Sequence, residues 1–423
     1  MASTMNFEEE EKMLKDKKIV LGITGGIAAY KSAELTREFV KKEAMVRVIM
    51  TKNACEFITP LTLQTLSGHP VFTEMFVPLT DFDMAHISLA EYADIVVIAP
   101  ATANIIGKIA SGLADDILTT TVMATKAPVL ICPAMNVNMY NNAIVKENIS
   151  KLTAHGYLFM VPGYGELACK AEGYGRLPEI SDILEEVESV LTPKDLVGEK
   201  ILVTAGPTRE PFDPVRYITN YSSGKMGYAL AITAKRRGAQ VTLISGPTTL
   251  PTPRDMTFIS VANAVDMRDA VMDHFDSSTV VIKAAAVADY RPSSRSARKI
   301  KKGGNGLDLK LERNPDIILE IGRKKGNRIL VGFAVETENI VENARNKLKK
   351  KNMDIIVAND VTKEGAGFGY DTNIIKIISA DGKIENVPLM GKMDVADRIL
   401  DRVKKIITSR QPAPRKRPAV RDR

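Results

Sequence analysis

Short apolar runs alternate with amphipathic stretches along the chain. An apolar run of about four to eight residues between turn residues is typical of a strand that is buried on both faces of a parallel sheet. Such strands are predicted at 19–23, 45–50, 95–99 and 129–132, and again at 201–205, 240–244, 280–287, 329–334 and 354–358. Amphipathic helices are predicted at 28–42, 180–191 and 226–237. This order predicts an α/β fold with two doubly wound parallel sheets.

Glycines mark the turn after the first predicted strand in each half of the chain. Gly25 and Gly26 follow the strand at 19–23, whereas Gly206 and the run SSGK at 222–225 follow the strand at 201–205. Glycine lets the backbone approach an anion closely, and a helix N-terminus directs free N–H groups toward it. The pattern predicts two nucleotide-type sites, with a plain tight turn as the alternative at each. Neither turn matches the strict G-x-G-x-x-G fingerprint.

The stretch LTPKDLVGEK at 191–200 predicts a linker, because it combines proline, glycine and lysine between two α/β patterns. A chain of 423 residues is long enough for more than one core. We therefore expect one domain at 1–199 and a second at 200–423.

Composition narrows the class of protein. Three cysteines in 423 residues indicate a reducing compartment without a disulfide framework, and four histidines make a His-rich metal centre a poor interpretation. No apolar run reaches the roughly 18 residues that span a bilayer, and the charged N-terminus lacks the apolar core of a signal peptide. These features predict a cytoplasmic protein without a membrane partner.

The net charge of +7 is concentrated at the C-terminus, where residues 410–423 carry six basic groups and one acid. Such a tail can contact nucleic acid or simply keep the chain in solution as a disordered segment. The absence of tryptophan and an aromatic content of 5% disfavour nucleic-acid binding. The disordered tail is therefore the favoured interpretation.

Three residues of the first half are candidates for chemistry. His86 is an acid–base group that titrates near neutral pH, and Asn136 places an amide just past an apolar strand. Cys169 lies in a glycine-rich loop, where a thiol is more accessible than Cys132 within a strand. Taken alone, His86 and Asn136 are more often structural, and Cys169 allows either interpretation.

Two sets of motifs carry a resemblance to known enzymes. TGGIAAYK, FITPLTLQTLSG, HISLA, APATANIIGKIASGLADD and PAMN resemble flavin-dependent cysteine decarboxylases. GPTREP, DPVRYITNYSSGKMG, AAAVADY, KIKK, NPDII and ANDV resemble phosphopantothenate–cysteine ligases. In this order they resemble the fused coenzyme A biosynthesis family of bacteria and archaea. The resemblance, which covers nearly the whole chain, implies an N-terminal flavoprotein domain and a C-terminal nucleotide-binding ligase domain, both Rossmann-like.

The decarboxylase resemblance implies FMN. In that family the flavin oxidises the cysteinyl side chain to a thioaldehyde, CO2 is lost, and the enethiol is then reduced. His86 is expected to handle the proton on the thiol side, Asn136 to hold the carboxylate and Cys169 to donate a proton in the final reduction. Lys170 stands where relatives commonly have glycine. The residues expected to bind FMN are Gly25, Gly26, Thr51, Ala99, Pro100, Thr102 and Asn104.

The ligase resemblance implies CTP with Mg2+ and an acyl-cytidylate intermediate. Asn220 is expected to help form this intermediate and Lys299 to convert it. The metal ligands are not identified by the sequence, and Asp289 is the candidate nearest the expected nucleotide. The residues expected to bind CTP are Ala285, Asp289, Lys299, Pro315, Asp316, Ile317, Ile318, Phe333, Lys347 and Lys351. Without the resemblance, the two helix lysines would be interpreted as solvated, Phe333 as core and Asn220 as a helix cap.

Three other functions compete with this interpretation: a decarboxylase of peptide cysteines, a non-catalytic regulatory subunit and a nucleic-acid binder. The ligase motifs argue against the first, and the presence of all three decarboxylase candidates argues against the second. The resemblance also implies a homo-oligomer of decarboxylase trimers and ligase dimers, up to a dodecamer. Its partners would be the small molecules 4′-phosphopantothenate, cysteine and CTP.

Overall fold

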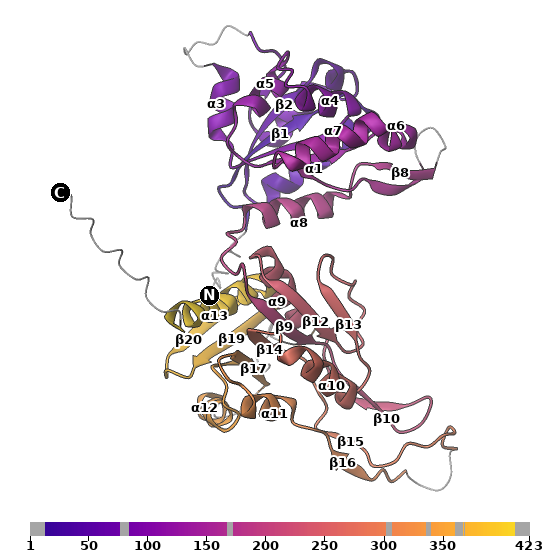
Figure 1. Cartoon of the computed structure of the whole chain (residues 1–423), viewed down its shortest axis with the longest axis vertical. Helices are drawn as coiled ribbons and strands as arrows, with labels where there is room; N and C mark the ends of the chain where they lie inside the picture. Colours follow the sequence, from indigo (N-terminus) through magenta and orange to yellow (C-terminus); the bar gives the residue numbers. More distant parts are fainter. Residues whose placement is uncertain are drawn as a thin grey trace, which may run out of the picture. The chain divides into compact units, whose positions relative to one another are not determined.

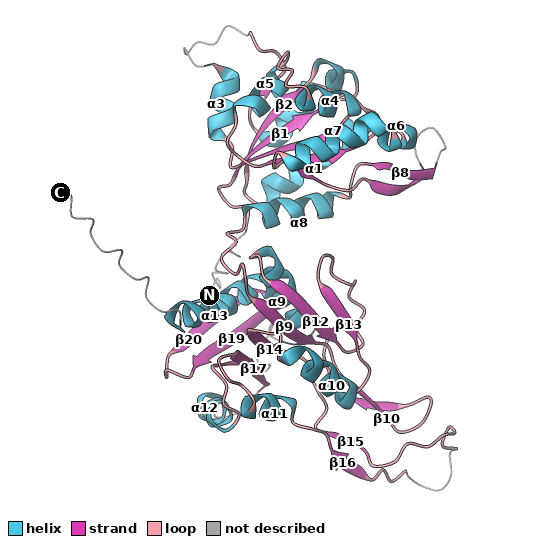
Figure 2. Cartoon of the chain, viewed as in Figure 1, coloured by secondary structure: helices cyan, strands magenta, loops and turns pink. Residues whose placement is uncertain are grey.

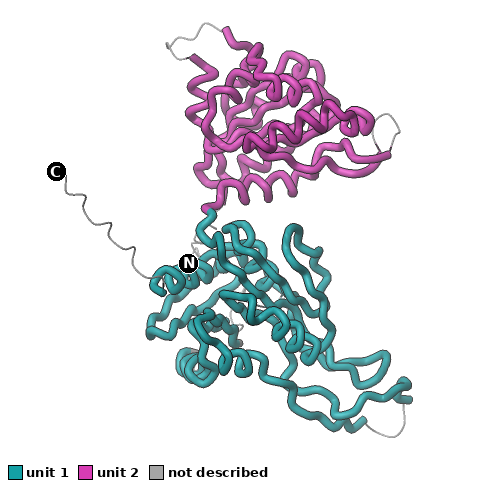
Figure 3. Tube along the Cα trace, in the orientation of Figure 1, with its two compact units in different colours: residues 1–10, 194–423 teal, residues 11–193 magenta. Residues whose placement is uncertain are grey.

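The computed structural model describes residues 13–76, 84–166, 172–301, 307–335, 340–359, 367 and 369–410. The chain divides into two compact units, residues 11–193 and residues 194–423 together with 1–10 (Figure 3). The basic tail beyond residue 410 lies outside the described residues, as do residues 1–12. Each unit is built on its own parallel sheet.

Six parallel strands form the sheet of the first unit in the order β3-β2-β1-β4-β5-β6. This is the strand order of a Rossmann fold. An antiparallel pair, β7 with β8, lies outside this sheet. The strands are β1 (Lys18–Ile23), β2 (Met45–Met50), β3 (Val71–Phe72), β4 (Ile95–Ala101), β5 (Val129–Pro133), β6 (Leu158–Phe159), β7 (Gly163–Glu166) and β8 (Glu172–Arg176).

Helices cover both faces of this sheet, because successive side chains of a strand point to opposite faces. In β1, Ile19 and Leu21 pack into one core, whereas Val20 packs into the other. The first face is covered by α1 (Lys31–Lys41), α2 (Pro60–Ser67) and α8 (Ile180–Leu191). The second is covered by α3 (Ala85–Tyr92), α4 (Ala103–Ala110), α5 (Ile117–Ala124) and α7 (Ala143–Ala154). Shorter turns are η1 (Ile27–Tyr30), η2 (Lys52–Glu56) and α6 (Val137–Asn141).

Eight strands form the sheet of the second unit, in the order β13-β12-β9-β14-β17-β18-β19-β20. Its first six strands are parallel and repeat the order of the first unit, and β19 and β20 extend one edge in antiparallel fashion. The strands are β9 (Lys200–Ala205), β12 (Gln240–Ser245), β13 (Thr257–Ser260), β14 (Val280–Lys283), β17 (Ile329–Val335), β18 (Ile355–Asn359), β19 (Thr372–Ser379) and β20 (Ile384–Gly391).

This sheet is also covered on both faces (Figure 1). Helices α9 (Lys225–Arg236) and α13 (Lys392–Arg410) pack on one face. The other face carries α10 (Ala264–Phe275), α11 (Ile317–Arg323) and α12 (Ile340–Lys350). Two antiparallel pairs form an arm that extends away from the sheet (Figure 2): β10 (Arg209–Pro211) with β11 (Tyr217–Thr219), and β15 (Tyr290–Pro292) with β16 (Leu311–Arg313).

The structure confirms the predicted fold class of two doubly wound sheets and differs from the expected elements in three places. The strand expected at 280–287 ends at Lys283, where its pairing with β17 stops, although Ala284 N still donates to Thr204 O and Ala286 N to Gly206 O beside β9. The helix expected at 28–42 begins with the separate turn η1. The antiparallel pair β19 and β20 was not predicted. Within the described ranges, no helix has the length and apolar character of a membrane span.

A buried arginine ties together three segments of the second unit. The Arg237 side chain is 7% exposed, and its guanidinium lies 2.7 Å from Asp195, 2.8 Å from Asp401 and 3.4 Å from Asp397. Burial alone disfavours its charge, but hydrogen bonds to Asp195 and Asp401 raise the pKa of Arg237 above its usual value. The cluster joins the segment before β9, the end of α9 and helix α13.

We predict that Arg237→Met lowers the free energy of unfolding by about 3 kcal/mol, because it leaves three neighbouring carboxylates without their cation. Urea unfolding followed by circular dichroism measures this change. Arg268→Met is the matched control, since Arg268 forms a surface pair with Glu320 whose removal should matter far less. Equal losses in the two variants would contradict the structural role of the buried cluster.

Candidate functional site

A pocket of about 780 Å3 opens at the carboxyl edge of the second sheet. Its walls are formed by residues 283–290 after β14, 220–227 leading into α9, 313–318 leading into α11 and 332–334 of β17. Strands β9 and β14 are neighbours whose following strands lie on opposite sides of the sheet. Doubly wound folds bind their ligands outside such a reversal of strand order.

The pocket brings together most of the residues that the ligase resemblance selected. Asn220 contributes its amide, which donates to Val287 O at 3.1 Å, and it does not cap α9, which begins after Gly224. The predicted residues that line the pocket are Asn220, Ala285, Asp289, Pro315, Asp316, Ile317, Ile318, Phe333, Lys347 and Lys351. These segments are distant in sequence and meet only because the strands are adjacent.

Lys299 is the predicted ligase residue that is not part of this lining. It is exposed and lies on the loop that follows β15, beside the turn between β10 and β11. The rest of its loop, residues 302–306, lies outside the described residues.

Positive charge dominates the pocket. Among the residues that the structure describes, six cationic side chains line it against two carboxylates, which are Asp289 and Asp316. Asp316 is partly neutralised by Lys351 at 2.9 Å, and its Oδ1 caps α11 by accepting from Leu319 N. Partial burial alone would raise its pKa, but the Lys351 hydrogen bond lowers the pKa of Asp316. The cations are Lys225, Lys283, Arg313, Lys347, Lys351 and Lys392. This excess favours a ligand with several negative charges.

Lys283 is a pocket residue that sequence reasoning missed. It ends β14 and faces the cavity, where burial and the neighbouring Lys351 lower its pKa to about 8. The sequence did contain a signal for this residue, because a lysine interrupts the apolar run VVIKAAAVA. A charge at the carboxyl end of a central strand is costly unless it faces a ligand site.

Gly224 allows the segment at 222–225 to reach the turn after β9. Its φ is +79°, and a Cβ there would lie 2.7 Å from Thr248 Cγ2 and 3.4 Å from Gly206 Cα. Both the dihedral angle and the close approach exclude a larger side chain. The turn itself therefore requires glycine at this position, which corresponds to the tight-turn alternative predicted from the sequence.

The carboxyl edge of the first sheet collects the residues expected to bind FMN. The turns after β1, β2 and β4 are neighbours, because these strands are adjacent. Thr24 Oγ1 donates to Pro100 O at 2.8 Å and accepts from Thr102 N at 3.1 Å, and Ser32 Oγ donates to Ala99 O at 2.8 Å. These bonds fix the 99–102 segment against the glycine turn.

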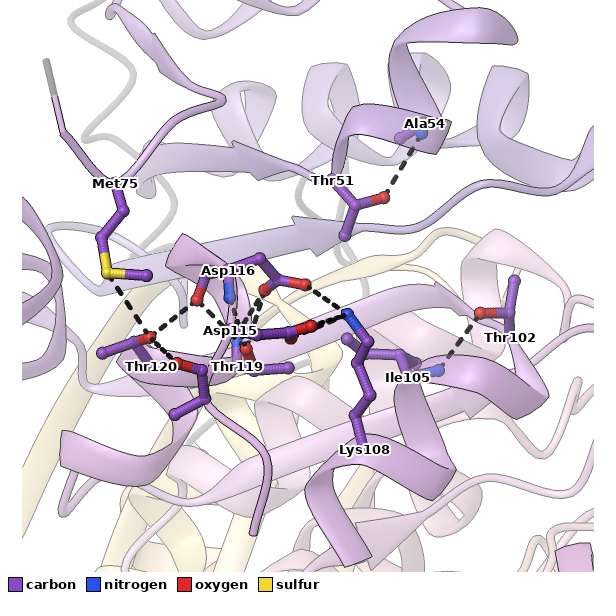
Figure 4. Close-up of polar contacts among 11 residues, drawn as sticks. Thr51, Ala54, Met75, Thr102, Ile105, Lys108, Asp115, Asp116, Thr119 and Thr120 are labelled. Atoms are coloured by element: carbon purple, nitrogen blue, oxygen red, sulfur yellow. Dashed lines mark hydrogen bonds and ion pairs between the residues drawn. The ribbon is translucent and has the colours of Figure 1, made fainter. Parts of the chain in front are cut away.

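The same edge fits a phosphate-bearing cofactor. A Cβ on Gly25 would lie 2.4 Å from Asn53 Cβ and 2.8 Å from its carbonyl carbon, so only glycine permits this approach. Thr51 and Thr102 each accept from a backbone N–H of their own helix, those of Ala54 and Ile105 (Figure 4). A hydroxyl that accepts such a bond keeps its own O–H for donation to an anion. Asn104 is exposed on the first turn of α4.

The three decarboxylase candidates come from different elements. His86 lies in the first turn of α3, and its Nδ1 is buried with no hydrogen-bond partner among the described residues. Asn136 follows β5, and its Oδ1 accepts from Asn138 N at 2.8 Å at the start of α6. Cys169 and Lys170 lie outside the described residues, in the connection between β7 and β8. The antiparallel pair of β7 and β8 contacts the segment that carries Asn136, since the N–H of the preceding residue, Met135, donates to Gly175 O in β8.

A charged cluster lies at the start of α5 (Figure 4), the helix that packs against α3. Lys108 Nζ donates to Asp115 at 2.8 Å and to Asp116 at 3.2 Å. Asp116 and Thr119 form a reciprocal cap at the first turn of α5. Helix α3, which carries His86, packs against the helix that this cluster caps.

The two cysteines that the structure describes are not activated thiols. Burial raises the pKa of Cys132 far above its usual value, and burial together with Glu56 raises the pKa of Cys55. Both therefore stay protonated near neutral pH. Among the described residues there is also no group of three or more His, Cys, Asp or Glu side chains placed to hold a metal.

Known proteins match both units. The family "Flavoprotein" matches residues 7–192, and the family "DNA/pantothenate metabolism flavoprotein C-terminal domain" matches residues 196–407. A Bacillus subtilis protein named Coenzyme A biosynthesis bifunctional protein CoaBC is 50% identical over 395 residues, covering 92% of this chain and 97% of its own. The Escherichia coli K12 protein of that name is 45% identical over 395 residues, with coverage of 92% and 97%.

A solved structure also resembles the second half. The crystal structure of the C-terminal domain of Coenzyme A biosynthesis bifunctional protein CoaBC is 43% identical, covers 51% of this chain and 99% of its own, and has a TM-score of 0.45. The Bacillus subtilis and Escherichia coli relatives, which each cover 92% of this chain, confirm the resemblance inferred from the motifs. The chain belongs to the family of coenzyme A biosynthesis bifunctional proteins.

Proposed function

We propose that this enzyme ligates 4′-phosphopantothenate to cysteine with CTP in residues 200–423, and decarboxylates the product to 4′-phosphopantetheine with FMN in residues 1–199. Membership of the bifunctional family gives the two activities, a ligase and a decarboxylase. The observation that carries the proposal is the cationic pocket at the carboxyl edge of the second sheet, which contains the residues selected by the ligase motifs other than Lys299.

The ligase step begins with a carboxylate oxygen of 4′-phosphopantothenate attacking the α-phosphorus of CTP, and pyrophosphate leaves. The cysteine amine then attacks the acyl carbon, CMP leaves and the amine loses a proton. The pocket cations neutralise the charge that builds on the phosphates. Asp289 is the carboxylate that would hold Mg2+, which commonly binds one or two protein carboxylates together with substrate phosphates. Asn220 lies on the wall of the same pocket, where its amide can orient the reacting groups.

The decarboxylase half relies on FMN as an electron sink that accepts two electrons from the substrate and later returns them. Gly25, Thr51 and Thr102 would hold the FMN phosphate. Gly25 permits a close backbone approach, and each threonine can donate its O–H to the phosphate. His86 would take the proton released from the substrate thiol, Asn136 would bind the carboxylate that leaves, and Cys169 would return a proton to the product.

We also propose that the enzyme assembles through both halves, as trimers of the first and dimers of the second. Exposed apolar side chains support this: in the first unit Phe76 is 88% and Leu61 69% exposed, and in the arm of the second Val215 is 59% and Tyr290 48% exposed. Large exposed apolar groups commonly mark protein interfaces.

The coupled reaction tests the proposed function. Purified enzyme is mixed with 4′-phosphopantothenate, cysteine, Mg2+ and either CTP or ATP, and products are followed by mass spectrometry. We expect 4′-phosphopantetheine with CTP, and Cys169→Ser should stop after ligation or at an oxidised, decarboxylated intermediate. If neither nucleotide supports formation of phosphopantothenoylcysteine, the proposed ligase function is wrong.

We predict that Gly25→Ala sharply lowers the flavin content, because the new Cβ would displace the Asn53 backbone from the cofactor edge. Flavin absorbance per purified chain measures the effect. Gly107→Ala is the control, since its Cβ would meet only Asn148 Nδ2 at 3.8 Å. The ligase activity of both variants should be normal, and full flavin content in Gly25→Ala would contradict the proposed site.

We predict that Lys283→Met weakens CTP binding roughly tenfold at pH 7, where the amine is charged and attracts phosphate. Because the pKa of Lys283 is about 8, the wild-type affinity should fall as the pH rises through that value, and the variant should show a smaller dependence, since burial also lowers the pKa of Lys392 in the same pocket. Titration calorimetry between pH 6.5 and 9.5, about 1.5 pH units to either side of that pKa, measures both effects. Lys349→Met, an exposed lysine outside the pocket lining, is the control, and an unchanged affinity in Lys283→Met would contradict the assignment.

A further inference from the structure

A buried aspartate organises the turn between β10 and β11. The Asp213 side chain is fully buried, and its Oδ1 accepts from Val215 N and Arg216 N, both at 2.8 Å. Its Oδ2 accepts from Arg216 Nε at 3.0 Å and Nη2 at 2.6 Å. One carboxylate oxygen therefore builds the turn, and the other holds the arginine.

The same pair reaches across 87 residues to the loop after β15. Ile300 N donates to Asp213 Oδ2 at 3.2 Å, and Arg216 Nη2 donates to Ile300 O at 2.9 Å. Both backbone polar groups of Ile300 are thus held by one ion pair. Burial alone would raise the pKa of Asp213. The bonds from Arg216 and from backbone N–H groups nevertheless hold this pKa well below its usual range. The clamp therefore stays charged throughout the neutral pH range.

The loop is also held on the other side of Lys299. Ser296 N donates to Phe212 O at 3.0 Å, and Ser296 Oγ donates to Arg298 O at 2.6 Å. Lys299 therefore lies between two fixed points, and its side chain is exposed. A loop held only at its base would leave this lysine free to sample many positions.

We propose that Asp213, acting with Arg216, is a positioning residue for Lys299: by clamping the backbone of Ile300, it sets where the lysine can reach during the conversion of the acyl-cytidylate. This inference rests on the proposed ligase function. Asp213 itself contacts no reacting group. Its effect should therefore fall on the step that uses Lys299, and the first step, in which pyrophosphate leaves, should be spared.

Asp213→Asn separates the clamp from the turn. The amide keeps one oxygen for Val215 and Arg216 N–H groups but presents an NH2 group where Oδ2 accepted from Arg216 and Ile300. Asp354→Asn is the matched control: Asp354 is also buried, accepts from Leu330 N and pairs with Lys325 and Arg410, all away from this loop. A general loss of stability would affect both variants alike.

Two rates are measured in single turnovers: pyrophosphate release without cysteine, and CMP release after cysteine is added. We expect Asp213→Asn to slow CMP release by roughly 10- to 100-fold, as a displacement of about 1 Å can, with little change in pyrophosphate release. In a Lys299→Gln background, Asp213→Asn should add almost nothing, because coupled residues are not additive. Hydrogen exchange at the Ile300 amide should accelerate in Asp213→Asn and not in Asp354→Asn.

Three results would overturn the inference: equal slowing of both rates, additive effects of the Asp213 and Lys299 changes, or unchanged exchange at Ile300. Failure of the proposed function would look different, since the wild-type enzyme would then release no pyrophosphate with any nucleotide.

Discussion

The strand order of the two sheets is the constraint on which both candidate sites depend. In each unit the chain adds two strands on one side of its first strand and then places the fourth on the other side, so that β1 adjoins β4 and β9 adjoins β14. Right-handed connections then carry the following segments to opposite faces of the sheet. In each unit, the turns that follow these two adjacent strands diverge at the carboxyl edge. Polar groups of these turns can contact a ligand there, while the strands remain buried.

Both candidate sites lie at the carboxyl edge of their sheet, but different types of residue line them. In the first, glycine and hydroxyl groups dominate: Gly25 permits a close backbone approach, and Thr24 ties the neighbouring turns together. In the second, lysines dominate, and burial together with the neighbouring Lys351 lowers the pKa of one of them, Lys283, to about 8. A half-buried cation of this kind gains most from a polyanionic ligand, since the ligand favours the charge that burial disfavours.

The sequence predicted what depends on local pattern and missed what depends on distant contacts. Apolar runs located the central strands, and the glycine turns located both carboxyl edges. Lys283 was missed because a single lysine in an apolar run was counted with the strand. Strands β19 and β20 were missed because they pair only with the sheet edge that β18 provides. The clamp on Ile300 joins residues 87 positions apart, and no local pattern signals such a contact. The roles of His86, Asn136 and Cys169 rest on the family resemblance, and Cys169 lies outside the described residues.

Hydrogen–deuterium exchange of the whole enzyme with and without CTP and Mg2+ tests most directly the central claim, that the nucleotide binds at the carboxyl edge of the second sheet. The account predicts slower exchange in the pocket segments 220–227, 283–290, 313–318 and 332–334, and no change in the turns at 24–26, 51–54 and 99–104 of the first unit. Protection confined to the first unit, or the absence of protection at the pocket under conditions that support turnover, would contradict it.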